Sequence, residues 1–497
     1  MKMRLAVPAA VFAVLVVAAF GDGYFRDELY YLACTRRMAW GYVDHPPLCV
    51  ALLWVVRHAA GESLLVLRAV AALATAAVVW MTGSLARRLG ADSFGQLLAM
   101  AAAAMAPELL GIGSFYSMNI LEVVFWTAAA RLLVEILDRP TDTRWVTLGL
   151  LLGLGLLNKI SVLWLGAGIA AGLVLTPARR LLLTRGPWLA GAIAGVIFLP
   201  HVLWQVTHDW PTLEFIRNAS RDKMQSNPPL SFLADQVMNL HPVALPIWLA
   251  GLVALLAGNR FRQYRLLGIA FLTVAAILIL NRTSRSGYLL PAFPMLIAAG
   301  GAWWSHVLHG TPARAAVLVL LAVAGAATLP LAVPVLPVDS YVRYSRALGV
   351  APSTEERQQL GRLPQFFADR QGWDRFVDQI GSAWDRLTPD ERSRAVIVTS
   401  NYGEAGAIEL MGRSRGMVAA SGHNNYWLWG PPSRPADVAI FPRRNRTNLD
   451  RLFAEVKQVG QTDCGDCMPY ENQLPIFICR GPRTPLVVLW PSFKHFN

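Results

Sequence analysis

The chain has 497 residues, of which 55% are hydrophobic and 15% are charged. A soluble domain carries roughly 25% charged residues, so this composition excludes an ordinary soluble protein and indicates many membrane spans. The formal net charge is +13, which in a soluble protein would suggest nucleic acid as a partner. Here the basic residues lie in loops between apolar runs, which favours lipid headgroups and anionic membrane substrates over nucleic acid.

Eleven apolar segments are candidate transmembrane helices. They cover residues 5–20, 63–85, 93–112, 118–137, 145–157, 160–176, 188–206, 241–257, 264–280, 288–308 and 314–333. Lys2 and Arg4 precede the first segment, which places the N-terminus in the cytoplasm by the positive-inside rule. No small-residue cleavage site follows before Asp22, so we expect a retained span rather than a signal peptide. With eleven spans, the C-terminal part lies outside the cytoplasm.

The first external loop, residues 21–62, is dense in ionisable side chains. Its acids and bases are Asp22, Asp27, Glu28, Asp44, Arg26, Arg36, Arg37 and His45. Ionisable groups held at a bilayer surface are costly to desolvate and usually mark a site. Arg36 and Arg37 would alternatively be interfacial anchors in a loop that only connects two spans. The mixture of acids and bases favours a functional loop over a purely basic anchor.

Lys159, next to Asn158 and between the fifth and sixth segments, is the only lysine inside an apolar run. One interpretation is a side chain that extends to the membrane interface. The other is a cation that faces an external anion. The sequence leaves both open.

Two outer loops are basic although the predicted orientation disfavours positive charge on that face. Arg217, Arg221 and Lys223 follow the seventh segment, and Arg282 and Arg285 follow the ninth, just before Tyr288. An external anion would explain these charges, and a phosphate is the simplest candidate.

The stretch 205–240 is long for a plain connection. It contains His208 and Glu214, then a Ser-Asn-Pro-Pro run at 226–229. A loop that covers a site and moves is one interpretation, and a disordered linker is the alternative.

After Pro330 the apolar runs stop, and residues 334–497 are long enough for a soluble domain. Residues 395–399 and 436–441 read as strands, with a turn and a helix at 404–411 after the first. This order predicts a small external α/β domain.

The cysteines of this domain are Cys464, Cys467 and Cys479. A Cys-x-x-Cys pair would be a redox motif or half of a zinc site, but no second ligand pair has suitable spacing. In an external domain a structural disulfide is favoured, with Cys479 as another candidate partner.

The charges expected on the outer face suit group transfer from a lipid phosphate. The carboxylates are Asp27, Glu28, Asp44 and Glu122, the last with Asn119 one turn before it, and His45 and His201 are further candidates for substrate or metal contact. A carboxylate would accept the proton of an attacking hydroxyl, and cations would stabilise the departing phosphate. The nucleotide-binding and common hydrolase motifs are absent from the sequence.

Four strings in the membrane part carry a resemblance to a known family. They are Tyr-Phe-Arg-Asp27-Glu28-Leu-Tyr-Tyr, Gly-Tyr-Val-Asp44-His45-Pro-Pro-Leu, Gly-Leu-Leu-Asn158-Lys159 and Tyr288-Leu-Leu-Pro. By these strings, residues 1–333 resemble the GT-C membrane glycosyltransferases, in the bacterial branch related to protein O-mannosyltransferases and aminoarabinose transferases. Two strings of the external domain, Ser400-Asn-Tyr-Gly-Glu-Ala and Gly422-His-Asn-Asn-Tyr-Trp-Leu-Trp, also resemble members of this branch.

The resemblance implies a multi-pass helical GT-C fold and an inverting transfer from a polyprenyl-phosphate sugar on the non-cytoplasmic face of the bacterial inner membrane. It makes Asp27 the expected base, assisted or positioned by Glu28, and Glu122 the second acidic position. Lys159, Arg282 and Arg285, with Tyr288, would bind the donor phosphate, and residues 205–240 would cap the site. Asp44, with His208 or Glu214, would be a candidate divalent-metal site. The acceptor would be a glycan, lipid or protein.

Two rival functions belong to other classes. A transporter or lipid flippase would share the spans and the basic residues, but it would need a polar path to the cytoplasmic side and internal repeats or broken helices. No repeat is present in the sequence, and the ionisable residues are expected at one face. A non-catalytic assembly protein would not need so many ionisable groups in the first loop.

Overall fold

A computed structural model describes residues 2–21, 23–432 and 434–497. The side chains of Lys2 and Arg4, on which the predicted orientation depends, lie outside the described residues, as does Asp22. The described chain divides into two compact units. The helical unit contains residues 2–21, 45–207 and 225–341, and the mixed unit contains residues 23–44, 208–224 and 342–497.

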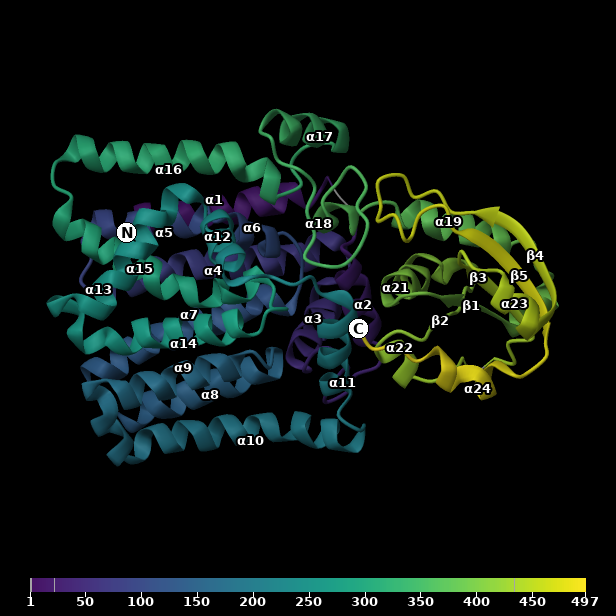
Figure 1. Cartoon of the computed structure of the whole chain (residues 1–497), viewed down its shortest axis with the longest axis horizontal. Helices are drawn as coiled ribbons and strands as arrows, with labels where there is room; N and C mark the ends of the chain where they lie inside the picture. Colours follow the sequence, from purple (N-terminus) through teal and green to yellow (C-terminus); the bar gives the residue numbers. More distant parts are fainter. Residues whose placement is uncertain (1, 22, 433) are drawn as a thin grey trace. The chain divides into compact units, whose positions relative to one another are not determined.

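The helical unit consists almost entirely of α-helices (Figure 1). Its helices are α1 (Lys2–Ala18), α3 (Leu48–Ala60), α4 (Leu64–Arg88), α5 (Ser93–Ala104), α6 (Pro107–Gly113), α7 (Met118–Asp138), α8 (Asp142–Asn158), α9 (Val162–Leu175), α10 (Arg185–Thr207), α12 (Pro229–Asn239), α13 (Leu245–Ala257), α14 (Arg265–Leu280), α15 (Phe293–Val307) and α16 (Thr311–Ala332). Each of the eleven predicted apolar segments overlaps at least one of these helices, so the expected mainly helical architecture is confirmed.

The helices differ in their capacity to cross a membrane. By length and composition, four stretches of the described residues are long and apolar enough: Leu64–Arg88, Arg185–Thr207, Asn259–Leu280 and Thr311–Ala332. The number rises to seven if each of three bent helix pairs is one span. The count of eleven spans and the orientation of the chain stay predictions.

One bent pair replaces a predicted straight segment. Residues 93–112 form α5 and α6, whose axes differ by 64°. Pro107 begins α6, and a proline at a first helical position has no amide hydrogen to continue the preceding helix. The predicted loop 21–62 likewise contains the apolar helix α3, which at 13 residues is about 20 Å long and too short for a straight crossing of the hydrocarbon core.

Small residues set the packing of the helical unit. Helices α8 and α10, α9 and α14, and α13 and α15 are neighbours (Figure 1). At the α13–α15 contact, a Cβ at Gly251 would overlap the backbone of Leu296, and one at Gly300 would overlap the backbone of Ile247. Without a glycine at both positions the two backbones would have to separate, which is the usual reason for small residues between membrane helices.

The mixed unit is built on a five-stranded sheet with the order β2-β1-β3-β5-β4. The strands are β1 (Ala395–Thr399), β2 (Ala419–Ser421), β3 (Val438–Pro442), β4 (Phe453–Gln461) and β5 (Pro475–Pro482). Strand β1 pairs in parallel with β2 and β3, whereas β5 pairs antiparallel with β3 and β4. The predicted strands at 395–399 and 436–441 are therefore confirmed, as is the α/β character of the C-terminal part.

The mixed unit also contains nine helices within the described residues. They are α2 (Arg26–Cys34), α11 (Pro211–Asn218), α18 (Gln365–Ala368), α19 (Trp373–Trp384), α20 (Pro389–Arg394), α21 (Tyr402–Met411), α22 (Asn425–Leu428), α23 (Thr447–Leu452) and α24 (Leu486–Leu489), while α17 (Val338–Ala347) lies where the chain passes from the helical to the mixed unit. Val396 and Val398 of β1 face a buried core with Leu449, Leu486 and Trp490. Helices α19 and α21 also pack on the sheet (Figure 1).

The boundary of the mixed unit differs from the predicted division at residues 333 and 334. Residues 23–44 of the first loop belong to it, because α2 packs against α21. Eight of the nine residues of α2 are buried, and so buried a helix needs a partner that covers most of its surface. Glycine at 406 permits the contact, since a Cβ there would press on the backbone of Leu29.

The predicted long loop 205–240 is mostly helical. It contains the end of α10, helix α11, a π-helical turn at Ala219–Lys223 and helix α12. Residues 208–224 belong to the mixed unit and residues 225–240 to the helical unit. The interpretation as a disordered linker is therefore wrong for this stretch, while a capping function stays a prediction.

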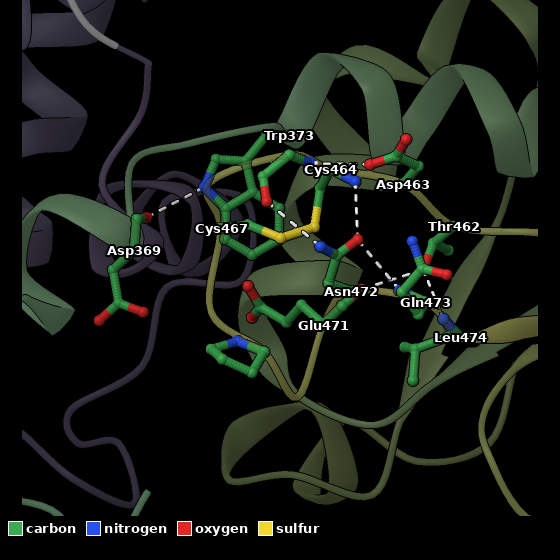
Figure 2. Close-up of a disulfide and its surroundings, with 12 residues drawn as sticks. Asp369, Trp373, Thr462, Asp463, Cys464, Cys467, Glu471, Asn472, Gln473 and Leu474 are labelled. Atoms are coloured by element: carbon green, nitrogen blue, oxygen red, sulfur yellow. Dashed lines mark hydrogen bonds between the residues drawn. A yellow bond between two sulfur atoms is a disulfide. The ribbon is translucent and has the colours of Figure 1, made fainter. Parts of the chain in front are cut away.

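A disulfide joins Cys464 and Cys467 in the mixed unit (Figure 2). Asn472 braces the loop, because its Oδ1 accepts from the Cys464 amide at 3.1 Å and its Nδ2 donates to Gly465 at 3.2 Å. Gly372 has a φ of +78°, and a Cβ there would overlap Cys464. Cys479 is a buried free thiol on β5 and takes no part in the bridge.

We expect alkylation of the denatured, unreduced protein to modify three cysteines, namely Cys34, Cys49 and Cys479, and all five after reduction. Cys464→Ser should lower the free energy of unfolding by about 2 kcal/mol, since so short a closed loop restricts the unfolded chain only modestly. Intact-mass measurement and thermal unfolding check the two statements. Five alkylated thiols before reduction would contradict the bridge.

Candidate functional site

Two adjacent carboxylates at the start of α2 have different environments. The amide of Phe25, just before the helix, donates to Glu28 Oε2 at 2.8 Å, and the Glu28 side chain is completely buried. A glutamate at this position closes the first turn of a helix by satisfying a free amide. Asp27 is only half-buried. Of the pair, Asp27 is therefore the carboxylate with access to a reacting group, and Glu28 has a structural partner.

Tyr402, the first residue of α21, holds Asp27. Its hydroxyl donates to Asp27 Oδ1 at 2.8 Å and accepts from Arg26 Nη2 at 3.3 Å. Burial raises the pKa of Tyr402 well above its ordinary value, so this hydroxyl keeps its proton. Arg26 is itself buried and also donates to the hydroxyl of Tyr470.

Asp44 is held in a similar way at the other end of the segment 23–44. Tyr30 of α2 donates its hydroxyl to Asp44 Oδ1 at 3.0 Å, and Asn425 Oδ1 lies 3.2 Å from the same hydroxyl. Asn425 Oδ1 also accepts from the amide of Val43 at 2.6 Å. A hydroxyl has one proton, so Tyr30 shares it between the aspartate and the amide oxygen. The hydrogen-bond partners of Asp27 and Asp44 thus come from α2 itself, through Tyr30, and from the C-terminal part of the chain, through Tyr402.

The metal site considered for Asp44 is not assembled in the structure. Glu214 pairs with Lys494 at 2.7 Å, and His208 is exposed just before α11. Among the described residues, no group of three or more His, Cys, Asp or Glu side chains is placed to hold a metal ion. Because a divalent cation needs several such ligands, these residues do not fit a metal, and no chemical step is assigned to one.

Glu122 and Lys159 form an ion pair in the helical unit, in which Glu122 is buried and Lys159 is half-buried. Lys159 Nζ lies 2.7 Å from Glu122 Oε2 and donates to Asn119 Oδ1 at 2.9 Å. The hydroxyl of Ser161 donates to the other Glu122 oxygen. Glu122 is 2% exposed. The ammonium of Lys159 is therefore held by two side chains of α7, and both interpretations of this lysine, at the membrane interface or facing an external anion, stay predictions.

This pair lies at the ends of its helices. Glu122 is in the second turn of α7, and Lys159 directly follows the last residue of α8. The ammonium also lies 4.9 Å from the centre of the Tyr288 ring, close enough for a cation–π contact. Sequence analysis named Glu122, Lys159, Asn119 and Tyr288 separately, and the fold of this unit brings them together.

Arg282 and Arg285 lie between α14 and the 3₁₀ helix Ser286–Ala292 that contains Tyr288. Arg282 is exposed and Arg285 half-buried. The backbone oxygen of Arg282 accepts from the amide of Asn227, two residues before α12, at 2.7 Å. The two arginines thus precede Tyr288 closely in the chain, and the Tyr288 ring lies against the Lys159 ammonium.

The two remaining histidine candidates have local partners in the helical unit. His45 is buried, with Nδ1 3.0 Å from the Pro46 carbonyl and 3.8 Å from Cys49 Sγ. His201 is buried in α10, 3.4 Å from Gln205 Nε2 and stacked near Trp204. A part of either histidine in substrate or metal contact stays a prediction.

Sequence reasoning assigned no role to Arg26, Tyr402, Tyr470, Asn425 or Ser161. Tyr402 and Asn425 lie in the two external-domain strings that were noted only for their resemblance to other proteins. The sequence signal that could have pointed to Tyr402 was the Ser-Asn-Tyr run that directly follows the predicted strand at 395–399. It could not indicate a contact with α2, which is almost 400 residues away in the chain.

Buried carboxyl groups surround this part of the mixed unit. Burial raises the pKa of Glu404 to about 7 and that of Asp369 to about 6. Burial also raises the pKa of Glu471 well above its ordinary value. Glu404 has a defined structural contact, since its Oε2 accepts from the Ser400 amide at 2.8 Å.

Comparison with known protein sequences gives a match to one family model and a similarity to one curated relative. Residues 44–204 match the family model described as dolichyl-phosphate-mannose-protein mannosyltransferase. The lipid A galacturonosyltransferase RgtD of Rhizobium johnstonii is 24% identical over 275 residues, a match that covers 53% of this chain and 56% of that protein. The chain therefore spans little more than half the length of this curated relative.

The structural likeness extends further. ArnT from Cupriavidus metallidurans in the apo state has a TM-score of 0.62 and 15% identity, with 96% of this chain and 99% of that chain covered. The structure of the same protein bound to undecaprenyl phosphate has a TM-score of 0.59 with the same identity and coverage. At 15% identity this likeness establishes the fold alone. The shared fold covers 96% of this chain, so it extends through both the helical and the C-terminal parts.

We expect Lys159→Met to lower the free energy of unfolding by about 3–5 kcal/mol, because it leaves the buried Glu122 charge without its cation. The double variant Lys159→Met/Glu122→Gln should recover most of the loss, since no unpaired charge remains. Thermal unfolding of the purified protein in detergent checks this, with Lys457→Met on exposed β4 as the matched control. A double variant no more stable than Lys159→Met would contradict a desolvated pair.

The pKa of Glu404 predicts a pH dependence of stability. The folded state keeps this proton at about pH 4.5–7, where the unfolded chain has lost it, so the free energy of unfolding should fall as pH rises through that window. Glu404→Gln should remove up to about 3 kcal/mol of this dependence. Unfolding midpoints at pH 5 and pH 8 measure it, with Glu455→Gln on exposed β4 as the control. An equal pH dependence in both variants would show that Glu404 is not the group responsible.

Proposed function

We propose that this chain, a GT-C membrane protein related to the protein O-mannosyltransferases and aminoarabinose transferases, is an inverting glycosyltransferase that uses a polyprenyl-phosphate sugar as donor. The observation that carries the proposal is the difference between the two carboxylates at the start of α2. Glu28 caps the helix, whereas Asp27 is half-buried and held through one oxygen by Tyr402. A fixed carboxylate with access to solvent is the arrangement that a general base requires.

In the proposed step, the Asp27 carboxylate accepts the proton of the acceptor hydroxyl. The acceptor oxygen bonds to the anomeric carbon of the sugar, and the bond from that carbon to the phosphate oxygen breaks. The polyprenyl phosphate departs with the electron pair, and the configuration at the carbon inverts. Because phosphate is already a good leaving group, the step needs no strong general acid opposite the base.

We assign the donor phosphate to the basic groups of the helical unit. Arg282 and Arg285 precede the short helix that contains Tyr288, and arginine forms strong paired hydrogen bonds with phosphate oxygens. Lys159 is already balanced by Glu122, so it would contribute through a pair that is fixed before the donor binds. The structure of ArnT with undecaprenyl phosphate supports a lipid of this class as the partner.

We further propose that the reaction takes place on the periplasmic face of a bacterial inner membrane, with the C-terminal domain on that side. The acceptor would be a glycan, a lipid or a protein, and a lipid phosphate is included among the lipid acceptors. RgtD is described as acting on lipid A, which makes a lipid acceptor the first class to test. Residues 205–240 would cap the site.

A flippase for polyprenyl lipids is the second candidate function. It would require ionisable groups along a path through the membrane. The Glu122–Lys159 pair instead lies at the ends of α7 and α8. This position favours chemistry at one membrane face over transport through the helices.

We expect Asp27→Asn to reduce transfer by about 10²–10⁴-fold, because it keeps the shape of the side chain and removes its basicity. The protein should still fold and bind a polyprenyl-phosphate analogue. Transfer from a polyprenyl-phosphate sugar in detergent or nanodiscs is the measurement, and mass spectrometry of glycolipids from a deletion strain supplies the acceptor.

Glu28→Gln is the matched control for this experiment. Since Glu28 caps α2, we expect a lower unfolding midpoint and a rate per folded molecule close to that of the wild type. The base would move to Glu28 if its variant lost transfer while Asp27→Asn kept it. Normal transfer by both variants would refute the first loop as the catalytic centre.

A further inference from the structure

We propose that Tyr402 is a positioning residue for this reaction, and that its hydroxyl fixes the Asp27 carboxylate in the orientation in which it accepts a proton. The inference rests on the proposed function, because it assumes that Asp27 is the base. It gives the C-terminal domain a part in the chemistry that its fold alone does not suggest. It also accounts for the string Ser400-Asn-Tyr-Gly-Glu-Ala, which the proposed transfer leaves unexplained.

The hydrogen bonds of Tyr402 have a defined direction. Its single proton goes to Asp27 Oδ1 at 2.8 Å, and its oxygen accepts from Arg26 Nη2 at 3.3 Å. An arginine that donates to a hydroxyl makes that hydroxyl a stronger donor, because consecutive hydrogen bonds polarise one another. Within the described part of the chain, Tyr402 is the only side chain that donates to the Asp27 carboxylate. The second carboxylate oxygen is thereby left for an acceptor hydroxyl.

The Tyr402 ring is fixed on both faces. Tyr30 of α2 stacks on it with centroids 4.5 Å apart and an interplanar angle of 25°, and His423 stacks at 4.7 Å and 23°. His423 stacks in turn on His495 at 4.8 Å. Stacked rings at these distances restrict rotation about the side-chain bonds. The hydroxyl therefore has one direction available, toward Asp27.

The turn that carries Tyr402 is built for the same contact. Asn401 caps α21 by accepting from the Glu404 amide at 3.0 Å, and the Tyr402 amide lies 3.3 Å from His423 Nδ1. Burial lowers the pKa of His423 well below its ordinary value, so this ring is neutral and its Nδ1 accepts that bond. A Cβ at Gly403 would overlap the side chain of Arg26. Specific contacts thus constrain the turn at residues 401–404: a helix cap, a hydrogen bond from the Tyr402 amide, and the close approach of Arg26 to Gly403.

The contact between α2 and α21 supplies the remaining constraint. Glycine at 406 lets α21 approach the backbone of Leu29 closely. The two helices therefore fix Asp27 relative to Tyr402 as parts of one compact unit. A base carried by a loop with no such support would sample many orientations, most of them unproductive.

Tyr402→Phe in the full-length protein is the first test. The variant keeps the stacked ring and removes only the hydroxyl. We expect the rate of transfer at saturating donor to fall about 10-fold or more, which is the usual effect of losing a hydrogen bond to a charged group. Binding of a polyprenyl-phosphate analogue should not change. The acid limb of the pH–rate profile should move to higher pH, because the reacting carboxylate loses a hydrogen-bond donor.

Tyr426→Phe is the matched control. Tyr426 belongs to the same unit and is buried, and its hydroxyl has no hydrogen-bond partner among the described residues. It also stacks near Tyr30. We expect wild-type rate and wild-type pH profile, so a general effect of removing a buried hydroxyl near α2 would appear here as well. Arg26, Asp369 and Asp44 also carry charge around Tyr402 and Asp27, and they are unchanged in both variants.

Two further measurements isolate the role of Asp27. In the Asp27→Asn background, Tyr402→Phe should cause no additional loss of transfer, since the group on which it acts is gone. Site-specific 3-fluorotyrosine at position 402, whose hydroxyl is a stronger donor, should move the acid limb to lower pH. It serves as the second variant if Tyr402→Phe fails to fold.

The outcomes separate the two hypotheses. If Asp27→Asn transfers sugar at the wild-type rate, the proposed base is wrong, and the positioning role falls with it. If Asp27→Asn loses transfer while Tyr402→Phe matches Tyr426→Phe in rate and pH profile, only the positioning role is wrong. A shifted profile together with additive losses in the double variant would also overturn it, because Tyr402 would then act independently of Asp27.

Discussion

The organisation of the mixed unit depends on a buried guanidinium. Arg26 is 7% exposed at the start of α2, and a charge removed from water is costly unless hydrogen bonds and opposite charges surround it. Tyr402 and Tyr470 accept its hydrogen bonds, and the backbone amide of Arg26 donates to Asp369 at 3.1 Å. These partners come from three distant stretches of the C-terminal part. The need to satisfy Arg26 therefore ties the first loop to the C-terminal domain.

The same constraint explains why neighbouring acids differ. The start of a helix has free amides that a carboxylate can accept, and Glu28 meets this need. Asp27 is one position away and so points about 100° from it around the helix, toward Tyr402. The helix cap thus gives one carboxylate a structural partner and leaves the other more exposed. Resemblance alone separated the two, and the geometry now gives a physical reason.

In the helical unit, buried charge is neutralised by an ion pair rather than by hydrogen bonds to tyrosine hydroxyls. Glu122 and Lys159 come from α7 and from the residue after α8, and they neutralise each other with help from Asn119 and Ser161. Such a pair costs desolvation energy but fixes the arrangement of its helices. It also places the ammonium against the Tyr288 ring. The arrangement of these side chains is in this way built into the packing of the helical unit.

The sequence by itself determined the features that depend on local composition. Apolar runs predicted the helices of the helical unit, and β-branched runs at 395–399 and 436–441 predicted two strands, because burial of periodic apolar residues decides local structure. The sequence also drew attention to Asp27, Glu122 and Lys159 as charges near apolar runs, which are rare and informative, whereas the expected roles of the two acids came from the family resemblance. Only the tertiary structure decided which groups meet. Tyr402 reaches Asp27 across 375 residues of chain, and no local pattern records a contact that two separately folded helices create when they pack.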